Sequence, residues 1–273
     1  MSPFFSIIIP VLNEEEFIGR LLNNLVKQTE HDFEVYVVDG NSTDKTASIV
    51  KSYEHKLPVT FLTSNIQNVS IQRNKGAGRA QGKYLIFFDA DVQIGPTFLS
   101  KLKSELENKK FLLVTTYVKA DSKNIYDKAI AQVLNYTTEV SKRIEKPFIP
   151  GFNLIVYHSI FNLIGGFRED VVHAEDYEIC QRLEKAGCKL TILKKPLLTF
   201  SLRRFRAEGR LNVLRKNAMA TLHLFTKGPI TKEIFSYPMG GEWYKSLENK
   251  HISRTTFDTF RKTILRFKRF ITV

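Results

Sequence analysis

The first half of the chain alternates short apolar runs with an amphipathic pattern, which predicts alternating strands and helices. Continuous apolar runs at residues 6–11, 33–38, 59–62 and 84–88 are typical of strands buried on both faces of a sheet. Residues 17–26 instead repeat apolar side chains every three or four positions, as an amphipathic helix does. Strands and helices that alternate at such short spacing predict a parallel sheet with right-handed crossovers.

The polar positions between these runs predict where the helices begin. We expect the first helix to open at Asn13, which would cap it, with three glutamates in the first turn, where the helix dipole favours negative charge. The remaining pattern predicts helices at about 45–54, 70–81, 96–107, 125–140 and 177–187, and further strands at 111–118 and 154–156. Asp176 then lies at or near a helix N-terminus, where capping is its simplest role.

Two aspartates separated by one residue follow the apolar run at 84–88. Asp89 and Asp91 should lie at the carboxyl end of a strand, the edge where ligands bind in open α/β sheets. Carboxylates at that edge suit Mg²⁺ or Mn²⁺ held against a bound phosphate. Because Asp also favours turns through its own local hydrogen bonds, these residues alone leave a turn and a metal site equally open.

The glycines of the first half do not form a nucleotide-binding fingerprint. Gly76, Gly78 and Gly82 neither follow a strand nor open a helix in the G-x-G-x-x-G frame, so they indicate close packing instead. The G-x-x-x-x-G-K-[ST] pattern is absent from the sequence, which argues against a P-loop NTPase.

The excess positive charge is concentrated near the C-terminus. The chain of 273 residues has a net charge of +13, and residues 201–273 hold 16 basic and 5 acidic residues, a net charge of +11. A basic segment of this kind favours an anionic partner, such as a membrane surface, a nucleic acid or a phosphorylated ligand. The default explanation is a basic face exposed to solvent.

The apolar runs and the two cysteines indicate the cellular compartment in which we expect the protein. No run approaches the roughly 20 residues that span a bilayer, and the short run at 4–9 lacks the features of a secretory signal. Cys180 and Cys188 should lie about 12 Å apart along one helix and its end, too far for a disulfide. We expect a cytoplasmic protein, with peripheral attachment to the cytoplasmic face of the membrane left open.

Four segments, in this order and at this spacing, resemble the family-two inverting nucleotide-sugar glycosyltransferases, which have a GT-A fold. They are residues 7–15, 37–46, 73–91, and Gly165-Gly166-Phe167 together with Glu175-Asp176. The resemblance covers residues 4 to about 190 and implies an α/β protein with a Rossmann-like, mostly parallel sheet flanked by helices. It implies a catalytic domain over 1–200, with a nucleotide-binding half at about 1–92 and an acceptor half at about 93–200, and a basic, helical C-terminal extension over 201–273.

The resemblance also implies roles for individual residues. Pro10, Leu12, Glu14 and Ala90 would line the nucleotide pocket, Asp39 would accept the imide proton of the base, and Arg73 would face the base or the phosphates. Asp89 would contact the ribose or the metal, Asp91 would coordinate the metal, and Arg203 or Arg204 would neutralise the leaving diphosphate. Asp176 would be the catalytic base and Glu175 would orient the site.

The implied function is metal-dependent, inverting transfer of a hexose from a UDP- or GDP-sugar to a lipid-linked or glycan acceptor. A sugar nucleotidyltransferase should have a glycine-rich loop after the first strand, and Pro10–Glu16 has no glycine. A binding module without catalysis would keep the fold and lose the carboxylates, which are present here. A nucleic-acid binder would explain the charge, but the basic segment has no recognisable nucleic-acid-binding signature.

Two stretches of the basic extension have helical periodicity. Leu211, Leu214, Ala218, Leu222 and Phe225 would share one face of a helix over about 208–225. Residues 257–271 repeat the pattern with basic residues beside it. Such a face either packs on the catalytic domain or lies at an anionic membrane surface, and both outcomes stay open.

Overall fold

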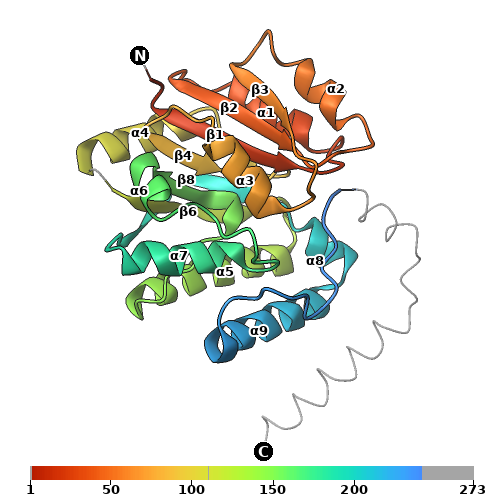
Figure 1. Cartoon of the computed structure of the whole chain (residues 1–273), viewed down its shortest axis with the longest axis vertical. Coiled ribbons are helices and arrows are strands. Elements are labelled where there is room, and N and C mark those ends of the chain that lie inside the picture. Colours follow the sequence, from red (N-terminus) through yellow and green to blue (C-terminus); the bar gives the residue numbers. More distant parts are fainter. Residues whose placement is uncertain (1, 110, 242–273) are drawn as a thin grey trace, which may run out of the picture.

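A single mixed sheet organises the protein (Figure 1). The computed structural model describes residues 2–109 and 111–241, and these form an eight-stranded sheet of order β3-β2-β1-β4-β7-β6-β8-β5. The strands are β1 (Phe5–Val11), β2 (Phe33–Asp39), β3 (Val59–Thr63), β4 (Tyr84–Phe87), β5 (Gln93–Ile94), β6 (Leu113–Ala120), β7 (Leu154–Tyr157) and β8 (Leu190–Phe200). Strands β1 to β4 are parallel, as predicted, whereas β7 runs antiparallel to both β4 and β6.

Helices cover both faces of the sheet. They are α1 (Ile18–Val26), α2 (Thr46–Lys51), α3 (Val69–Ala77), α4 (Phe98–Lys109), α5 (Ile125–Arg143), α6 (His158–Leu163), α7 (Glu175–Lys185), α8 (Arg203–Ala207) and α9 (Arg210–Lys227), with a 3-10 turn at Gly151–Asn153. Core residues of α1, α2, α4 and α5 pack on one face, and those of α3, α6 and α7 pack on the other. Figure 1 shows α3, α6 and α7 in front of the sheet.

Apolar side chains of β1 point alternately to the two faces of the sheet, so both faces must be covered by helices. Ile7 and Ile9 belong to the core under α1 and α4, while Ile8 belongs to the core under α3 and α6. A strand buried on both faces reads as a continuous apolar run, as predicted. Gly76 lets α3 approach this strand, because a Cβ at Gly76 would lie 2.6 Å from Ile8. The prediction that this glycine serves close packing is confirmed.

The prediction that Asn13 opens the first helix is wrong. Helix α1 begins at Ile18, and its first turn contains no acidic residue. Asn13 instead has a positive φ of 51° and its Oδ1 accepts a hydrogen bond from Thr43 N at 2.8 Å. The backbone N–H of Glu14 donates to Thr46 Oγ1 at 2.8 Å. Residues 12–17 therefore form a loop tied to the loop after β2, and this loop borders the site described below.

The part of the chain after β8 packs against the sheet domain through ion pairs. Asp127, which is buried at the start of α5, accepts hydrogen bonds from Arg210 at 2.7 Å and from Arg206 at 3.3 Å. Asp121 holds Arg206 through both carboxylate oxygens. The helix expected over about 208–225 is confirmed as α9, and the short α8 lies before it.

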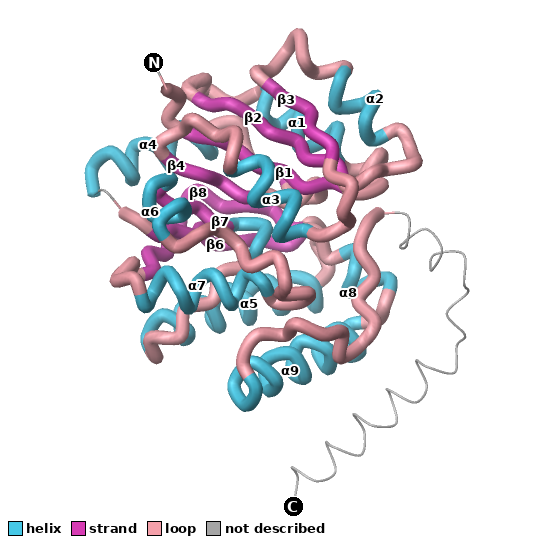
Figure 2. Tube along the Cα trace, viewed as in Figure 1, coloured by secondary structure: helices cyan, strands magenta, loops and turns pink. Residues whose placement is uncertain are grey.

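After α9 the chain turns back along the helix and passes α8 on its way to β1 (Figure 2). Ile230 pairs with His173, and Gly241 N donates to Leu12 O at 3.0 Å. We call residues 229–241 the return segment. The tail prediction at 257–271 lies outside the described residues.

The apolar face of α9 is exposed. Leu211, Leu214, Leu222 and Phe225 are all exposed, while α9 contacts the rest of the protein through Val213 and Ala220. At 100° per residue these two sets lie on opposite sides of the helix. Of the two outcomes left open for this face, packing on the catalytic domain involves only Phe225, whose ring lies 6.3 Å from Tyr177, among the described residues.

Two further observations concern the compartment predictions. None of the helices in residues 2–109 and 111–241 combines the length and apolar character that a bilayer-spanning helix needs. Cys180 and Cys188 are buried free thiols, so the prediction of no disulfide between them is confirmed.

Candidate active site

A pocket of about 270 Å³ opens at the carboxyl edge of β1 and β4. Its walls come from several parts of the chain: the end of β1 and the loop after it, the start of α3, the residues after β4, the 3-10 turn, the start of α7, and the stretch from the end of β8 through α8. They include Pro10, Leu12, Glu14, Arg73, Asp89, Ala90, Asp91, Glu175, Arg203 and Arg204. The return segment adds Met239 and Gly240. Ten of the residues predicted for the site thus line one pocket.

Arg73 connects the two sides of this pocket. Its Nη2 donates to Asp89 Oδ1 at 3.0 Å, and its Nη1 donates to Glu175 Oε1 at 2.8 Å. The Arg73 side chain is only 2% exposed and its guanidinium lies 5.3 Å from the Phe167 ring. Burial alone would lower the pKa of Arg73, but Asp89 and Glu175 hold that pKa above its ordinary value. Arg73 therefore stays charged and fixes a carboxylate from β4 beside one from α7.

Arg203 makes a second bridge. Its Nη1 and Nη2 donate to the two carboxylate oxygens of Glu14 at 2.7 and 2.6 Å, and its Nε lies 2.8 Å from Asp91 Oδ2. The guanidinium also lies 4.4 Å from the Phe17 ring. A planar guanidinium is suited to this two-oxygen geometry, which Lys cannot reproduce. Arg203 thus joins α8 to the loop after β1 and to the residues after β4.

Burial dominates the electrostatics of the two partners of Arg203. It raises the pKa of Glu14 to about 7, although the Arg203 guanidinium acts in the opposite direction. It also raises the pKa of Asp91, with Asp89 adding to the shift and Arg203 opposing it. A nearby positive charge stabilises the ionised form of a partly desolvated carboxylate. Glu14 and Asp91 together therefore form a suitable environment for a cationic ligand.

Asp176 lies behind Glu175 at the start of α7. Its Oδ2 accepts a hydrogen bond from Gly151 N at 3.0 Å and its Oδ1 accepts one from Tyr177 N at 2.8 Å. Burial, followed by the repulsion of Glu175, raises the pKa of Asp176 to about 7. Glu175 lines the pocket, and Asp176 is not among its lining residues. The backbone turns sharply here, because Ala174 has a left-handed φ of 58°.

Two of the predicted residues, Asp39 and Arg204, and the nearby His173 have partners outside this carboxylate cluster. Asp39 is buried at the end of β2, where its Oδ2 accepts from Ser42 N at 3.0 Å and its Oδ1 accepts from Ser42 Oγ, and it does not line the pocket. Arg204 donates to Glu208 and to Pro238 O, both at 3.0 Å. His173 packs its ring on Phe235 and Tyr237, so it contacts the return segment.

The donor set fits a divalent metal only in part. Asp89 and Asp91 offer carboxylate oxygens, which Mg²⁺ and Mn²⁺ prefer, and Asp91 already binds a cation, the Arg203 guanidinium. Within residues 2–109 and 111–241, no cluster of three or more His, Cys, Asp or Glu residues could hold a metal. The two aspartates therefore suit an ion that takes its remaining ligands from a bound phosphate and water.

Several pocket residues belong to no motif or periodic pattern of the sequence. Phe152 and Phe200 stack with their rings 5.3 Å apart and 5° from parallel, and both line the pocket. Met239 and Gly240 come from the return segment, which has no periodic pattern. These residues meet only because the chain folds back, so local sequence could not reveal them.

Comparison with known proteins identifies the family. The profile described as "Glycosyl transferase family 2" matches residues 6–165. The chain therefore belongs to glycosyl transferase family 2, and its mixed sheet with helices on both faces is the GT-A fold of that class.

Several known proteins match about a third of the chain. The poly(ribitol-phosphate) beta-N-acetylglucosaminyltransferase TarS of Staphylococcus aureus is 42% identical over 94 residues, which cover 33% of this chain and 16% of TarS. The validoxylamine A glucosyltransferase of Streptomyces hygroscopicus subsp. limoneus is 36% identical over 104 residues, 37% of this chain and 23% of that enzyme. The chain thus matches less than a quarter of the length of either relative.

Solved structures share more of the fold. A crystal structure of S. aureus TarS residues 1–349 in complex with UDP-GlcNAc matches with a TM-score of 0.62 at 25% identity, covering 74% of this chain and 58% of that one. The mannosyltransferase PcManGT from Pyrobaculum calidifontis, in complex with GDP-Man and Mn²⁺, matches with a TM-score of 0.61 at 21% identity, covering 80% of this chain and 65% of that one. The second likeness concerns the fold alone.

Proposed function

We propose that this protein transfers a hexose, with inversion, from a nucleoside diphosphate sugar to an acceptor linked to a membrane lipid or a cell-envelope glycan. Membership of glycosyl transferase family 2 supports the reaction class. The observation that carries the proposal is the convergence of Asp89, Asp91, Glu175 and Arg203 on one pocket at the carboxyl edge of the sheet. That edge is where open α/β folds bind nucleotides.

On the donor side, we assign the nucleotide to the part of the pocket formed by Pro10, Leu12, Glu14 and Ala90. Asp39 would accept the imide proton of the base after exchanging its bonds with Ser42. Buried Arg73 Nε has no hydrogen-bond partner among the described residues, which supports a nearby anionic ligand. Asp89 and Asp91 would hold Mg²⁺ or Mn²⁺, which when bound would neutralise charge on the diphosphate.

Arg203 and Arg204 would stabilise the leaving group. In-line displacement at the anomeric carbon leaves negative charge on the departing diphosphate, and fixed positive charges lower the energy of that state. Arg203 now binds Glu14 and Asp91, so it would have to exchange one of these carboxylates for a phosphate oxygen.

Asp176 would remove the proton from an acceptor hydroxyl. A base works best when its pKa lies near the working pH, and burial brings the pKa of Asp176 to about 7. Glu175, held by Arg73, would orient the acceptor side of the pocket. An acceptor phosphate is already anionic and needs no base, so the dependence on Asp176 separates hydroxyl from phosphate acceptors.

Turnover of a panel of donors tests the proposal. The full chain should hydrolyse at least one UDP-, GDP- or dTDP-sugar slowly, and faster with a membrane extract that supplies the acceptor. Chelation should remove this activity, and Mg²⁺ or Mn²⁺ should restore it. Asp91→Asn should abolish the activity, whereas Asp170→Asn, which changes an exposed aspartate, should leave it intact. Binding of a donor without turnover under every condition would instead indicate a nucleotide-sugar-binding protein.

A further inference from the structure

The exposed face of α9 has the chemistry of a membrane-binding surface. Leu211, Leu214, Leu222 and Phe225 are 61%, 47%, 65% and 59% exposed. With Ala218 they follow one line along the helix, three or four residues apart. We call these five residues the α9 stripe. A contiguous apolar stripe on the outside of a protein marks a surface that another molecule covers.

The position of α9 is fixed mainly by residues outside the stripe. Within the stripe, Phe225 contacts α7, with its ring centroid 6.3 Å from that of Tyr177, while its side chain stays 59% exposed. Arg210 binds buried Asp127 at 2.7 Å, and Lys216 binds Glu208 at 2.5 Å. Val213 and Ala220 are the buried residues of the helix. Figure 1 shows α9 at the edge of the molecule, beyond α5 and α7. At 100° per residue, Val213, Lys216 and Ala220 lie on the side of α9 away from the stripe, and Arg210 lies at its flank, so these contacts turn most of the stripe outward.

The charge of α9 identifies the kind of partner. The helix contains four basic residues, Arg210, Arg215, Lys216 and Lys227, and no acidic residue. Exposed Arg215 lies directly beside the stripe at 100° per residue. Arg210 is already paired with Asp127, and Lys216 with Glu208. Arg215 and Lys227 supply the remaining positive charge of α9. A second copy of this face would bring like charges together at Arg215. An anionic bilayer instead accepts the apolar side chains between its acyl chains and the basic ones among its headgroups.

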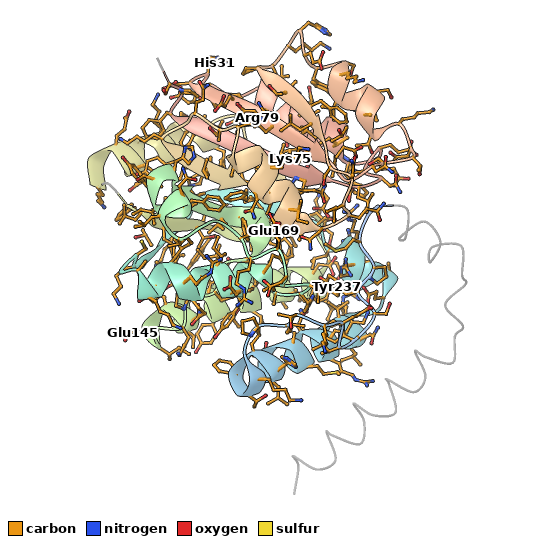
Figure 3. All side chains as sticks on the ribbon, viewed as in Figure 1. His31, Lys75, Arg79, Glu145, Glu169 and Tyr237 are labelled. Atoms are coloured by element: carbon orange, nitrogen blue, oxygen red, sulfur yellow. The ribbon has the colours of Figure 1, made fainter. Side chains whose placement is uncertain are left out.

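We propose that the α9 stripe docks the protein on an anionic lipid surface. This inference rests on the proposed function and extends it. Docking through α9 would bring the pocket close to the lipid surface that holds a lipid-linked acceptor. The return segment runs back from α9 past Tyr237, labelled in Figure 3, to Met239 and Gly240 in the pocket wall. Arg204 contacts this segment through Pro238 O at 3.0 Å and through the Tyr237 ring at 3.7 Å.

Sedimentation with lipid vesicles tests the docking surface. The full chain should bind vesicles of phosphatidylcholine mixed with phosphatidylglycerol and bind pure phosphatidylcholine much more weakly. Leu214→Glu combined with Leu222→Glu should reduce binding to the anionic vesicles roughly tenfold or more, because the change removes apolar area and adds two like charges at the surface. Arg215→Glu should reduce it by a smaller factor.

A matched control separates this face from general hydrophobicity. Leu163→Glu combined with Leu197→Glu changes two exposed leucines on α6 and β8 and should leave binding unchanged. Equal binding by the α9 variant and the wild type would overturn the proposal, as would a wild-type dimer that the α9 variant converts to a monomer in light scattering. The assay contains no nucleotide, so a failure here leaves the donor-turnover test of the proposed function independent.

Discussion

Individual carboxylates of the pocket are held in place by two arginines, and each pairing has a measurable consequence. Arg73 holds Asp89 and Glu175, and Arg203 holds Glu14 and Asp91. The side chains of Arg73 and Arg203 are only 2% and 15% exposed. A buried ion pair adds little to the free energy of unfolding, because its attraction is offset by the cost of removing both charges from water. Removing one partner, however, leaves the other charge buried and unpaired. Substitution of one member of these ion pairs should therefore have a large effect on the free energy of unfolding.

Arg203→Ala should destabilise the fold. It leaves Glu14 buried without its guanidinium, and breaking a buried pair in this way costs roughly 3 kcal/mol or more of the free energy of unfolding. Urea unfolding measures the loss, and Glu14→Gln added to Arg203→Ala should recover part of it. Arg168→Ala breaks an exposed pair with Asp170 and should cost well under roughly 1 kcal/mol. Equal losses for the two arginine variants would contradict the buried-pair assignment.

Asp176→Asn should change how stability depends on pH. A carboxylate whose pKa is raised by folding stabilises the folded state while protonated, and that contribution is lost as pH rises through the folded pKa, about 7. Between pH 5.5 and 8 the wild type should therefore lose about 1 to 2 kcal/mol relative to the Asn variant. Unfolding at the two pH values measures this difference, which is unaffected by any pH-independent cost of the substitution. A constant difference would show that the folded pKa of Asp176 is not raised.

The same variant reports on the acceptor. If the acceptor group is a hydroxyl, Asp176→Asn should lower kcat by about a hundredfold or more while nucleotide affinity stays within about twofold. A phosphate acceptor would give only a mild loss of kcat. Initial rates with a membrane extract and calorimetry with UDP or GDP supply the two measurements.

Among the elements, α8 and α9 depend on a small set of ion pairs at the start of α5. Asp127 accepts from Ser122, Arg206 and Arg210 while almost fully buried. Burial alone would raise the pKa of Asp127, but these donors hold it below its ordinary value. The carboxylate therefore stabilises this arrangement at neutral pH and ceases to do so only in acid.

Asp127→Ala should loosen α8 and α9. It leaves two arginines without their shared acceptor, so protease cleavage within residues 203–227 should become about tenfold faster or more, while cleavage elsewhere changes little. Limited proteolysis followed by mass spectrometry locates the cuts. Asp170→Ala removes an exposed partner of Arg168 and serves as the control. Unchanged cleavage in Asp127→Ala would mean that other contacts hold α9.

The sequence predicted the elements better than the contacts between them. Apolar runs located β1 to β4 because strands buried on both faces leave a clear pattern. The start of α1 was misjudged because Asn13 and the following glutamates are equally suited to a helix cap and to a loop that binds Thr43 and Thr46. The α9 stripe was recognised, but periodicity cannot tell whether an apolar face is covered.

At the scale of the whole molecule, the pocket lies where the parallel half of the sheet meets the antiparallel strands and the C-terminal part. The family resemblance implied that Asp89, Asp91, Glu175 and Arg73 share one site, and all four line the pocket. The resemblance could not predict the Glu14–Arg203 pair, whose members lie 189 positions apart. The return segment likewise reaches the pocket only through the path of the folded chain.

Gly240→Ala should weaken nucleotide binding. Gly240 has a φ of +91°, and a Cβ there would lie 2.9 Å from Leu12 O, so the substitution pushes the return segment away from the pocket wall. Affinity for UDP or GDP, measured by calorimetry, should fall about tenfold. Gly187→Ala carries similar backbone strain, with a φ of +85° and no neighbour within 4 Å, and should leave affinity unchanged. Equal effects of the two substitutions would show that strain, and not contact, is responsible.

The hydrogen bond from Gly241 to Leu12 has a consequence for synthesis on the ribosome. Strands β1 to β4 can pair as soon as the first hundred or so residues emerge, because their crossovers are local. The wall formed by Arg203, Arg204 and the return segment must wait until nearly 240 residues are exposed. A nascent chain would therefore first carry the parallel half of the sheet with an open, solvated pair of aspartates after β4, and would acquire the closed pocket only after the return segment has emerged.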